Sequence, residues 1–169
     1  MKKLSVMFLL FCLSVCQIVS AKDVISNLIS TYSVKDGADY KFIDKETIIG
    51  PIREAMAKDS TKNQADIEKM QQEFPIETVT ILTLKDCTKD IWNDFTQDFN
   101  TSYKDGSNGY KTQMTVKKDG VVHIIVKGDE PIKSELIMVV IKYDDRAIVK
   151  VTGKLSETEI NNITQQYKE

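Results

Sequence analysis

The sequence predicts an α+β domain, a two-layer sandwich in which a largely antiparallel sheet carries its helices mainly on one face. Two observations support this prediction. Four apolar segments between residues 110 and 152 are separated by short turn-forming stretches, which is typical of an antiparallel meander. Residues 88–103 instead place large apolar side chains at intervals of four, the spacing of an amphipathic helix that packs on a sheet.

The chain opens with a segment that has the layout of a secretory signal peptide. Two lysines precede an uncharged and largely apolar run that extends to residue 21. Signal peptidase requires small side chains before the cleaved bond, and Ala21 meets this requirement. We therefore predict cleavage between Ala21 and Lys22, which divides the chain into a signal peptide (1–21) and a single domain (22–169).

Two other fates of this leader stay open on the residues alone. Lipidation at Cys16 would anchor the protein in a membrane, but Val15 is bulky for the preceding position and a helix predicted from residue 24 leaves little tether. An uncut leader would be just long enough to span a bilayer. The favoured prediction is free secretion, into the periplasm or beyond, with no membrane span in the mature chain.

Composition argues against several partners. After removal of the leader, 21 lysines and arginines stand against 25 aspartates and glutamates, a net charge of −4 with both signs interspersed. Such a surface has no basic footprint for nucleic acid or anionic membrane, so neither is expected as a partner. Cys12 and Cys16 leave with the signal peptide, so Cys87 alone remains and no internal disulfide can form.

The N-terminal half of the domain is predicted to mix helices and strands. Asp23 and Thr88 each precede a helical pattern, and their side-chain oxygens can cap the free amides of a first turn. Gly50 and Pro51 are expected to break or kink a third helical pattern. The predicted elements are helices over 24–33, 48–56, 66–73 and 88–103, strands over 39–43 and 75–84, and a loop over 59–65.

The C-terminal half is predicted to be the meander. In its first strand every second residue from Tyr110 to Val116 is one of Tyr, Thr, Met and Val, so this set is expected on one face with the other face wet. Asp119-Gly120 is a signal for a two-residue hairpin turn. The four strands are predicted over 110–117, 121–127, 134–143 and 146–152.

One helix is predicted to close the chain over residues 156–167. Ser156 and Glu159 have the spacing of a capping box, in which each side chain binds the other residue's backbone amide. This helix is expected to cover the same sheet face as the helix over 88–103.

The chain carries few residues suited to catalysis. His123 is the only histidine and lies in an apolar strand, without the cysteines or clustered carboxylates that a metal site or a catalytic triad needs. Asp94 and Asp98 lie four apart on one predicted helix, as a general acid and base do, which leaves a carboxylate-dependent hydrolase as the alternative. Both also lie opposite Phe95 and Phe99, on the expected solvent side. We therefore assign no catalytic, cofactor-binding or metal-binding residue and expect no cofactor.

Two stretches of the mature chain are distinctive, "DVISNLISTYSVKDGADY" near its start and "SELIMVVIKYDDRAIVKVTGKLSETEI" near its end. Together they resemble a secreted family of Bacteroidota called domain of unknown function 4252. These markers are structural, so the resemblance implies a fold and an extracytoplasmic address but no chemistry. It also implies a small envelope protein with an accessory role in envelope sensing or stress.

The resemblance suggests one modification and one role. Asp59-Ser60-Thr61 resembles the acceptor for O-glycosylation in secreted proteins of Bacteroidota, which makes Ser60 and Thr61 candidate glycan sites. The expected role is that of a non-catalytic envelope accessory or binding module. It would contact an unknown envelope protein or component through the exposed face of its sheet, in an oligomeric state that the sequence does not predict.

Overall fold

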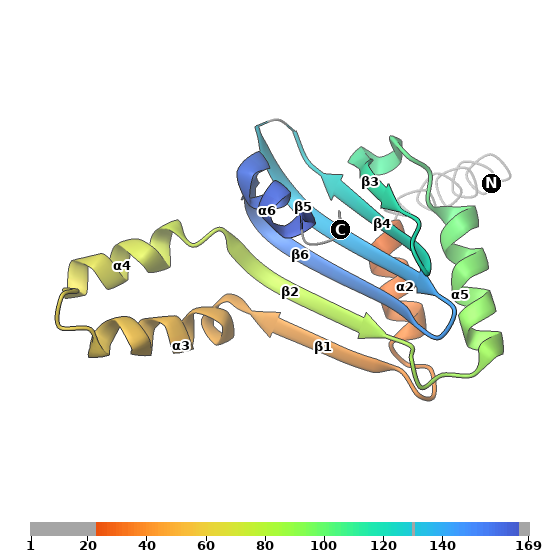
Figure 1. Cartoon of the computed structure of the whole chain (residues 1–169), viewed down its shortest axis with the longest axis horizontal. Coiled ribbons are helices and arrows are strands. Elements are labelled where there is room, and N and C mark those ends of the chain that lie inside the picture. Colours follow the sequence, from red (N-terminus) through yellow and green to blue (C-terminus); the bar gives the residue numbers. More distant parts are fainter. Residues whose placement is uncertain (1–22, 130, 166–169) are drawn as a thin grey trace, which may run out of the picture.

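The computed structural model of the chain describes residues 23–129 and 131–165 (Figure 1). The predicted signal peptide, the predicted cleavage position between Ala21 and Lys22, and Cys16 therefore lie outside the described residues. Within them, six strands form one antiparallel sheet in the order β1-β2-β6-β5-β4-β3. The predicted α+β class with a largely antiparallel sheet is confirmed.

The elements follow one another along the chain with short connections. The strands are β1 (Asp39–Asp44), β2 (Ile76–Thr83), β3 (Tyr110–Val116), β4 (Gly120–Lys127), β5 (Ile132–Lys142) and β6 (Arg146–Ser156). The helices are α2 (Val24–Tyr32), α3 (Lys45–Lys58), α4 (Gln64–Glu73), α5 (Lys89–Ser102), the 3₁₀ turn η1 (Ser107–Gly109) and α6 (Glu157–Gln165).

Strands β3 to β6 pair in sequence order, which confirms the predicted meander. Strands β1 and β2, which pair antiparallel but are connected through α3 and α4, then extend the sheet, because β2 pairs with β6. The predicted two-residue turn at Asp119-Gly120 is wrong: Gly120 is the first residue of β4 and pairs with Lys142 of β5. The connection from β3 to β4 is therefore one residue longer than a two-residue turn.

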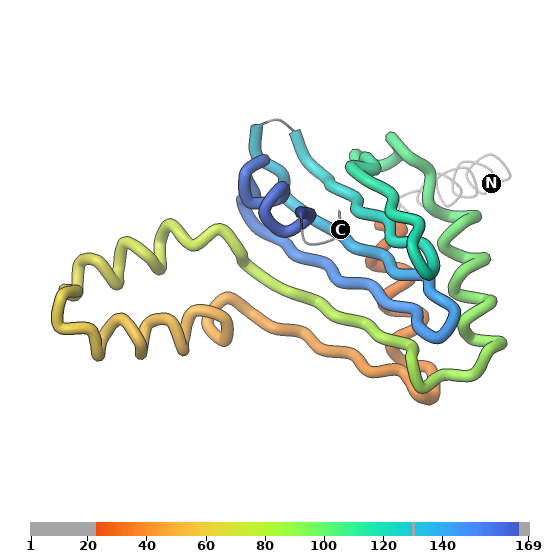
Figure 2. Tube along the Cα trace, in the orientation of Figure 1, coloured from red at the N-terminus to blue at the C-terminus, as the bar shows by residue number. Residues whose placement is uncertain are grey.

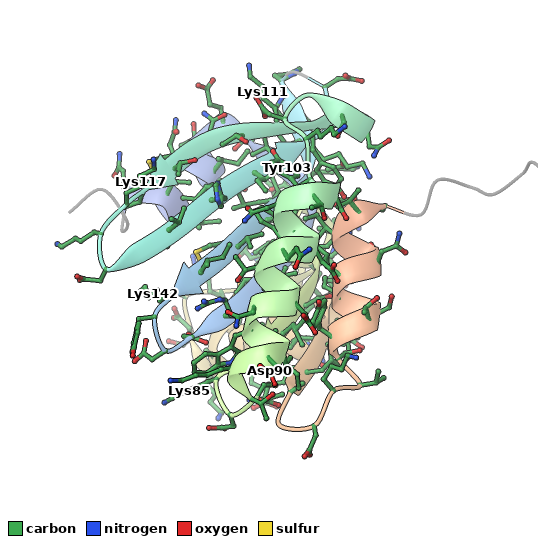
Figure 3. The ribbon with its side chains drawn as sticks, turned by 90° about the vertical axis from the view of Figure 1, so that its right-hand side faces the viewer. Lys85, Asp90, Tyr103, Lys111, Lys117 and Lys142 are labelled. Carbon is green, nitrogen blue, oxygen red and sulfur yellow. The ribbon has the colours of Figure 1, made fainter. Side chains whose placement is uncertain are left out.

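Alternating side chains give the sheet two different faces. On the face that we call the helical face, Ile137 and Val139 of β5 pack in one core cluster with residues of α2 and α5. These two helices lie side by side on one side of the sheet, with Asp90 and Tyr103 near the ends of α5 (Figure 3). Phe95 is fully buried there, and the ring of Tyr32 meets it edge-on at 5.2 Å between centroids.

Helix α6 lies on the opposite face, which we call the open face (Figure 1). Its Ile160 packs in a second cluster with Ile124 of β4 and Leu136 of β5. The expectation that this helix shares a face with α5 is therefore wrong. Strands β4 and β5 carry apolar side chains on both faces. Helices α2 and α5 bury those on the helical face, and α6 buries part of those on the open face.

A bulge in β3 overturns the predicted single apolar face of this strand. Thr112 pairs with Ile125, whereas Met114 pairs with the preceding residue of β4, Ile124, so Gln113 is an extra residue in the ladder. A bulge of this kind shifts the alternation by one residue. Tyr110 is consequently buried in the helical-face core, while Met114 packs against the open-face cluster.

Helices α3 and α4 form an arm that projects beyond the ends of β1 and β2 (Figure 2). The expected break at Gly50 and Pro51 is not observed, because α3 continues through both residues. Pro51 removes only one helical hydrogen bond, to the carbonyl of Thr47, and Thr47 is exposed, so water can satisfy that carbonyl.

The predicted helix caps are confirmed. Asp23 Oδ1 accepts a hydrogen bond from the amide of Ile25 at 3.0 Å, and the side chain of Thr88 caps α5. At α6 the amide of Ser156 donates to Glu159 Oε2 at 2.7 Å, and the amide of Glu159 donates to Ser156 Oγ at 3.3 Å. These local signals fix where the helices begin.

Candidate functional site: the open face of the sheet

The open face carries a continuous apolar surface across five strands. Its partly buried residues pair with one another across the sheet: Ile81 with Val149, Val149 with Met138, and Val79 with Val151. The residues of this open-face strip are Val79 and Ile81 on β2, Val149 and Val151 on β6, Met138 and Val140 on β5, Val122 and Ile124 on β4, and Met114 and Val116 on β3. The predicted wet face is therefore apolar over most of the sheet.

Helix α6 covers only part of this strip. It has nine residues and a length of about 14 Å, whereas the eleven residues of β5 extend over about 37 Å. Ile160 and Thr164 are buried beneath the helix, but Ile163 at its margin is 37% exposed. A small cavity of about 40 Å³ lies there, lined by Thr164 and by the apolar side chains of Ile124, Leu136, Met138, Val149, Val151 and Ile163.

The helical face carries a cluster of charges that sequence reasoning missed. Lys150 lies 3.1 Å from a carboxylate oxygen of Asp23 and 3.0 Å from one of Glu135, while Lys127 lies 3.6 and 3.5 Å from the same two residues. All four side chains are largely buried, and the Lys127 ammonium also lies over the ring of Tyr110. Two positive and two negative groups thus neutralise each other at the start of α2.

The cluster shifts the pKa of Asp23 and that of the neighbouring Tyr110. Burial opposes ionisation of Asp23, but the Tyr110 hydroxyl, Lys150 and Lys127 outweigh it and lower the pKa of Asp23 to about 2. Burial and the neighbouring Asp23 and Glu135 raise the pKa of Tyr110, so its hydroxyl stays a donor and binds Glu135. The available signal was a charged residue inside the apolar stretch of a strand, Glu135 in β5 and Lys150 in β6.

Asp94 and Asp98 line one groove between α2 and α5, with a volume of about 350 Å³. Both are exposed, as their position opposite Phe95 and Phe99 predicted. Asp98 accepts a hydrogen bond of 2.7 Å from the hydroxyl of Tyr32. Burial first, and then the hydrogen bond to Asp98, raise the pKa of Tyr32, so this group remains a proton donor to the carboxylate.

His123 and Cys87 take structural positions. His123 packs against Phe99 with 5.3 Å between ring centroids and lies 3.3 Å from the Thr115 hydroxyl; burial and then Lys117 lower its pKa. Cys87 is buried in the helical-face core, and burial raises the pKa of its thiol. In the part of the chain that the structure describes, no group of three or more His, Cys, Asp or Glu side chains is placed to hold a metal ion.

Ser60 and Thr61 lie in the loop at the tip of the arm, between α3 and α4 (Figure 2). Both are exposed. The carboxylate of Asp59 accepts hydrogen bonds from the amide of Thr61 at 2.9 Å and from its hydroxyl at 2.7 Å, and these two bonds lower the pKa of Asp59. A modifying enzyme could therefore reach either hydroxyl.

Comparison with known proteins gives one match. The family described as "Domain of unknown function (DUF4252)" matches residues 47–163, from the start of α3 into α6. The second of the two distinctive stretches lies inside this match and the first lies before it. No curated protein and no solved structure matches the chain. No helix among residues 23–129 and 131–165 is long and apolar enough to cross a membrane.

Proposed function

The chain belongs to the DUF4252 family, and we propose that it is a non-catalytic binding module of the cell envelope whose contact surface is the open-face strip. In this proposal the protein is secreted and acts as an accessory in envelope sensing or stress. The observation that carries the proposal is the continuous apolar strip that extends beyond α6. Eight of the ten strip residues stay partly accessible and the other two, Val122 and Ile124, are buried; contiguous accessible apolar surface marks sites of interaction on proteins.

The occupant that we propose is an apolar-sided helix of an envelope protein. Helix α6 provides the precedent, because it seats Ile160 and Thr164 on the same sheet and leaves the neighbouring strip uncovered. A second helix would continue that interface over Ile81 and Val149, in the manner of other helix-in-groove contacts. Met114 and Met138 also suit this role, since methionine adapts to a partner of irregular shape.

Site-specific cross-linking tests the proposal. Ile81→p-benzoylphenylalanine places a photoreactive group in the strip, and Thr115→p-benzoylphenylalanine places the same group at an exposed strand position whose side chain points to the other face. In cells that make the protein naturally, we expect position 81 to cross-link to one envelope protein, through residues of an amphipathic helix that mass spectrometry maps. Position 115 should give no such product.

Three outcomes would overturn the proposal. Equal products from positions 81 and 115 would show that the strip is not a specific surface, and products from neither would remove the partner. A cross-link between two copies of the chain would replace the envelope partner by self-association. Substitution Val34→p-benzoylphenylalanine adds a second control, since Val34 is 81% exposed and lies in the loop after α2.

A separate experiment tests the proposed secretion and the proposed cleavage of the signal peptide. Intact-mass measurement on protein from its native host should give the mass of residues 22–169, as expected for cleavage between Ala21 and Lys22. A diacylglycerol adduct that begins at Cys16 would instead support a lipid anchor, which holds a protein on membranes at high salt because the acyl chains are apolar. An added hexose-containing mass on Ser60 or Thr61 would support the proposed O-glycosylation.

A carboxylate-dependent hydrolase is the second proposal. The observation in its favour is that Asp94 and Asp98 line one groove. It ranks lower because both carboxylates are exposed and Asp98 already accepts the Tyr32 hydroxyl. If it holds, the protein should cleave chromogenic glycosides or esters, and Asp94→Asn and Asp98→Asn should each abolish the cleavage. Absence of cleavage by the unsubstituted protein would end this proposal.

A further inference from the structure

A second surface, separate from the open-face strip, is hollowed on the helical face beside the edge of the sheet. There α2 leaves the first strands uncovered, and a groove of about 500 Å³ runs between the helix and β1, β2 and β6. This volume is in the range of roughly 300–1,000 Å³ that is usual for sites of small ligands. The residues that line it are Ser26, Ile29, Ser30, Ser33, Tyr40, Phe42, Thr78, Thr80, Lys150 and Thr152.

The polar lining of this groove consists almost entirely of hydroxyl groups. Two serines lie on α2 and a third, Ser33, directly follows the helix, while three threonines come from β2 and β6. Thr78 and Thr152 face each other across the strands, with 2.6 Å between their hydroxyl oxygens. Ser26, Ser30 and Ser33 already donate to Asp23 and to the carbonyls of Asn27 and Ser30, so their oxygens keep lone pairs that can accept hydrogen bonds from the hydroxyl groups of a ligand.

Two aromatic rings form the outer wall of the groove. Tyr40 and Phe42 on β1 point to the helical face, opposite Leu82 and Thr80, and remain 45% and 58% exposed. They are two residues apart and therefore about 7 Å apart along the strand. The apolar face of a sugar ring packs on the electron-rich face of an aromatic ring. Two rings at this spacing can contact successive units of one oligosaccharide.

The charge of the groove gives a strongly anionic ligand no advantage. Lys150 is the one charged residue in its lining, and its ammonium is held between Asp23 and Glu135. With Lys127 on the same carboxylates, the cluster is neutral as a whole. We propose that this groove binds a neutral oligosaccharide, with Tyr40 and Phe42 stacking on its rings and the serine and threonine hydroxyls bonding to its hydroxyl groups.

Titration with defined oligosaccharides tests this site on the mature protein. The probes are cellotriose, maltotriose, laminaritriose, mannotriose and chitotriose, with oligogalacturonate as the anionic probe and a Ser/Thr-rich peptide as the extended-chain probe. We expect at least one neutral probe to shift amide resonances of α2 and β1 in NMR spectra, with a Kd of about 1 mM or tighter. Oligogalacturonate should bind more weakly.

Matched variants separate binding from folding. Tyr40→Ala and Phe42→Ala should each weaken binding about tenfold, a difference of about 1.4 kcal/mol, without unfolding the domain, because both side chains are about half exposed and lie outside the core clusters. Tyr143→Ala is the control, since Tyr143 is 87% exposed in the turn between β5 and β6.

Several results would overturn the assignment of this site. These are no shift with any neutral probe, equal affinity in Phe42→Ala, or preference for the peptide or the anionic probe. The result is independent of the cross-linking experiment on Ile81, because the two surfaces lie on opposite faces of the sheet.

Discussion

Both faces of the sheet carry many apolar side chains, but the helices cover the two faces to different extents. The helical face receives α2 and α5, buries Phe95 and Phe99, and closes one margin with a neutral cluster of charges. Among the described residues the open face receives only α6, and its strip contains mainly partly buried Val, Ile and Met side chains. The difference indicates that the helical face forms the larger core, whereas α6 covers only part of the apolar open face.

The same comparison explains how charges are distributed. On the helical face, Lys150 and Glu135 lie on strands but keep partners within 3.1 Å, so their burial is compensated. On the open face the strip has no charged member. A charge introduced there would lack a built partner and would affect binding more than folding.

The largest difference that we expect between the two faces is in the free energy of unfolding. Phe95→Ala should lower the free energy of unfolding by about 3–5 kcal/mol, because it removes a fully buried ring from the helical-face core. Val116→Ala, at the margin of the open-face strip, should lower it by less than about 1.5 kcal/mol. Urea denaturation of both variants measures the contrast, and equal losses would show that the two faces contribute alike.

A smaller loss of stability is expected at acid pH. The folded pKa of Asp23 is about 2, below its ordinary value of 3.8, so its contribution is complete above about pH 5 and is lost progressively as the pH falls towards 2. We expect this loss to be about 1–2 kcal/mol, since the carboxylate is partly exposed. Urea denaturation between these pH values measures it.

Asp23→Asn is the matched control for that titration. Asparagine caps helices as well as aspartate does, so α2 should keep its start. The variant should be less stable than the unsubstituted protein near neutral pH and should lack this part of the acid dependence. An unchanged pH slope in the variant would show that Asp23 is not responsible.

The smallest effect on stability is expected on the open face. Val116→Lys should change the free energy of unfolding by less than about 1 kcal/mol, because the long lysine stem can lie along the sheet while its ammonium reaches water. It should nevertheless reduce binding of the apolar dye ANS. Thr115→Lys, one residue away and on the other face, should leave dye binding unchanged. Equal dye binding by all three proteins would contradict an accessible apolar strip.

Sequence patterns predicted the features that depend on neighbours in the chain. Asp23, Thr88 and the Ser156–Glu159 pair were identified as caps because a cap acts within one turn of helix. Consecutive strands gave the meander for the same reason. The position of Asp94 and Asp98 on the exposed side of α5 also followed from helical spacing, but the Tyr32 hydroxyl that binds Asp98 comes from a distant segment.

Four features required contacts between distant segments. The bulge at Gln113 depends on how β3 meets β4, and no local signal distinguishes it from regular alternation. The side on which α6 packs was ambiguous because β4 and β5 are apolar on both faces. The charge cluster joins residues from α2, β4, β5 and β6, and the groove beside it depends on how much of β1 and β2 remains uncovered by α2.

The sequence by itself thus determined the class of fold, the order of its elements and most of their ends, because hydrophobic period and capping act over a few residues. Tertiary structure alone decided which face each helix covers, and hence where the apolar strip and the hydroxyl-lined groove lie. The physical reason is that side-chain alternation defines two faces for each strand but does not say which helix will cover either of them. The covered face is set by tertiary packing, in which Ile160 of α6 and Phe95 of α5 lie on opposite faces of the same sheet.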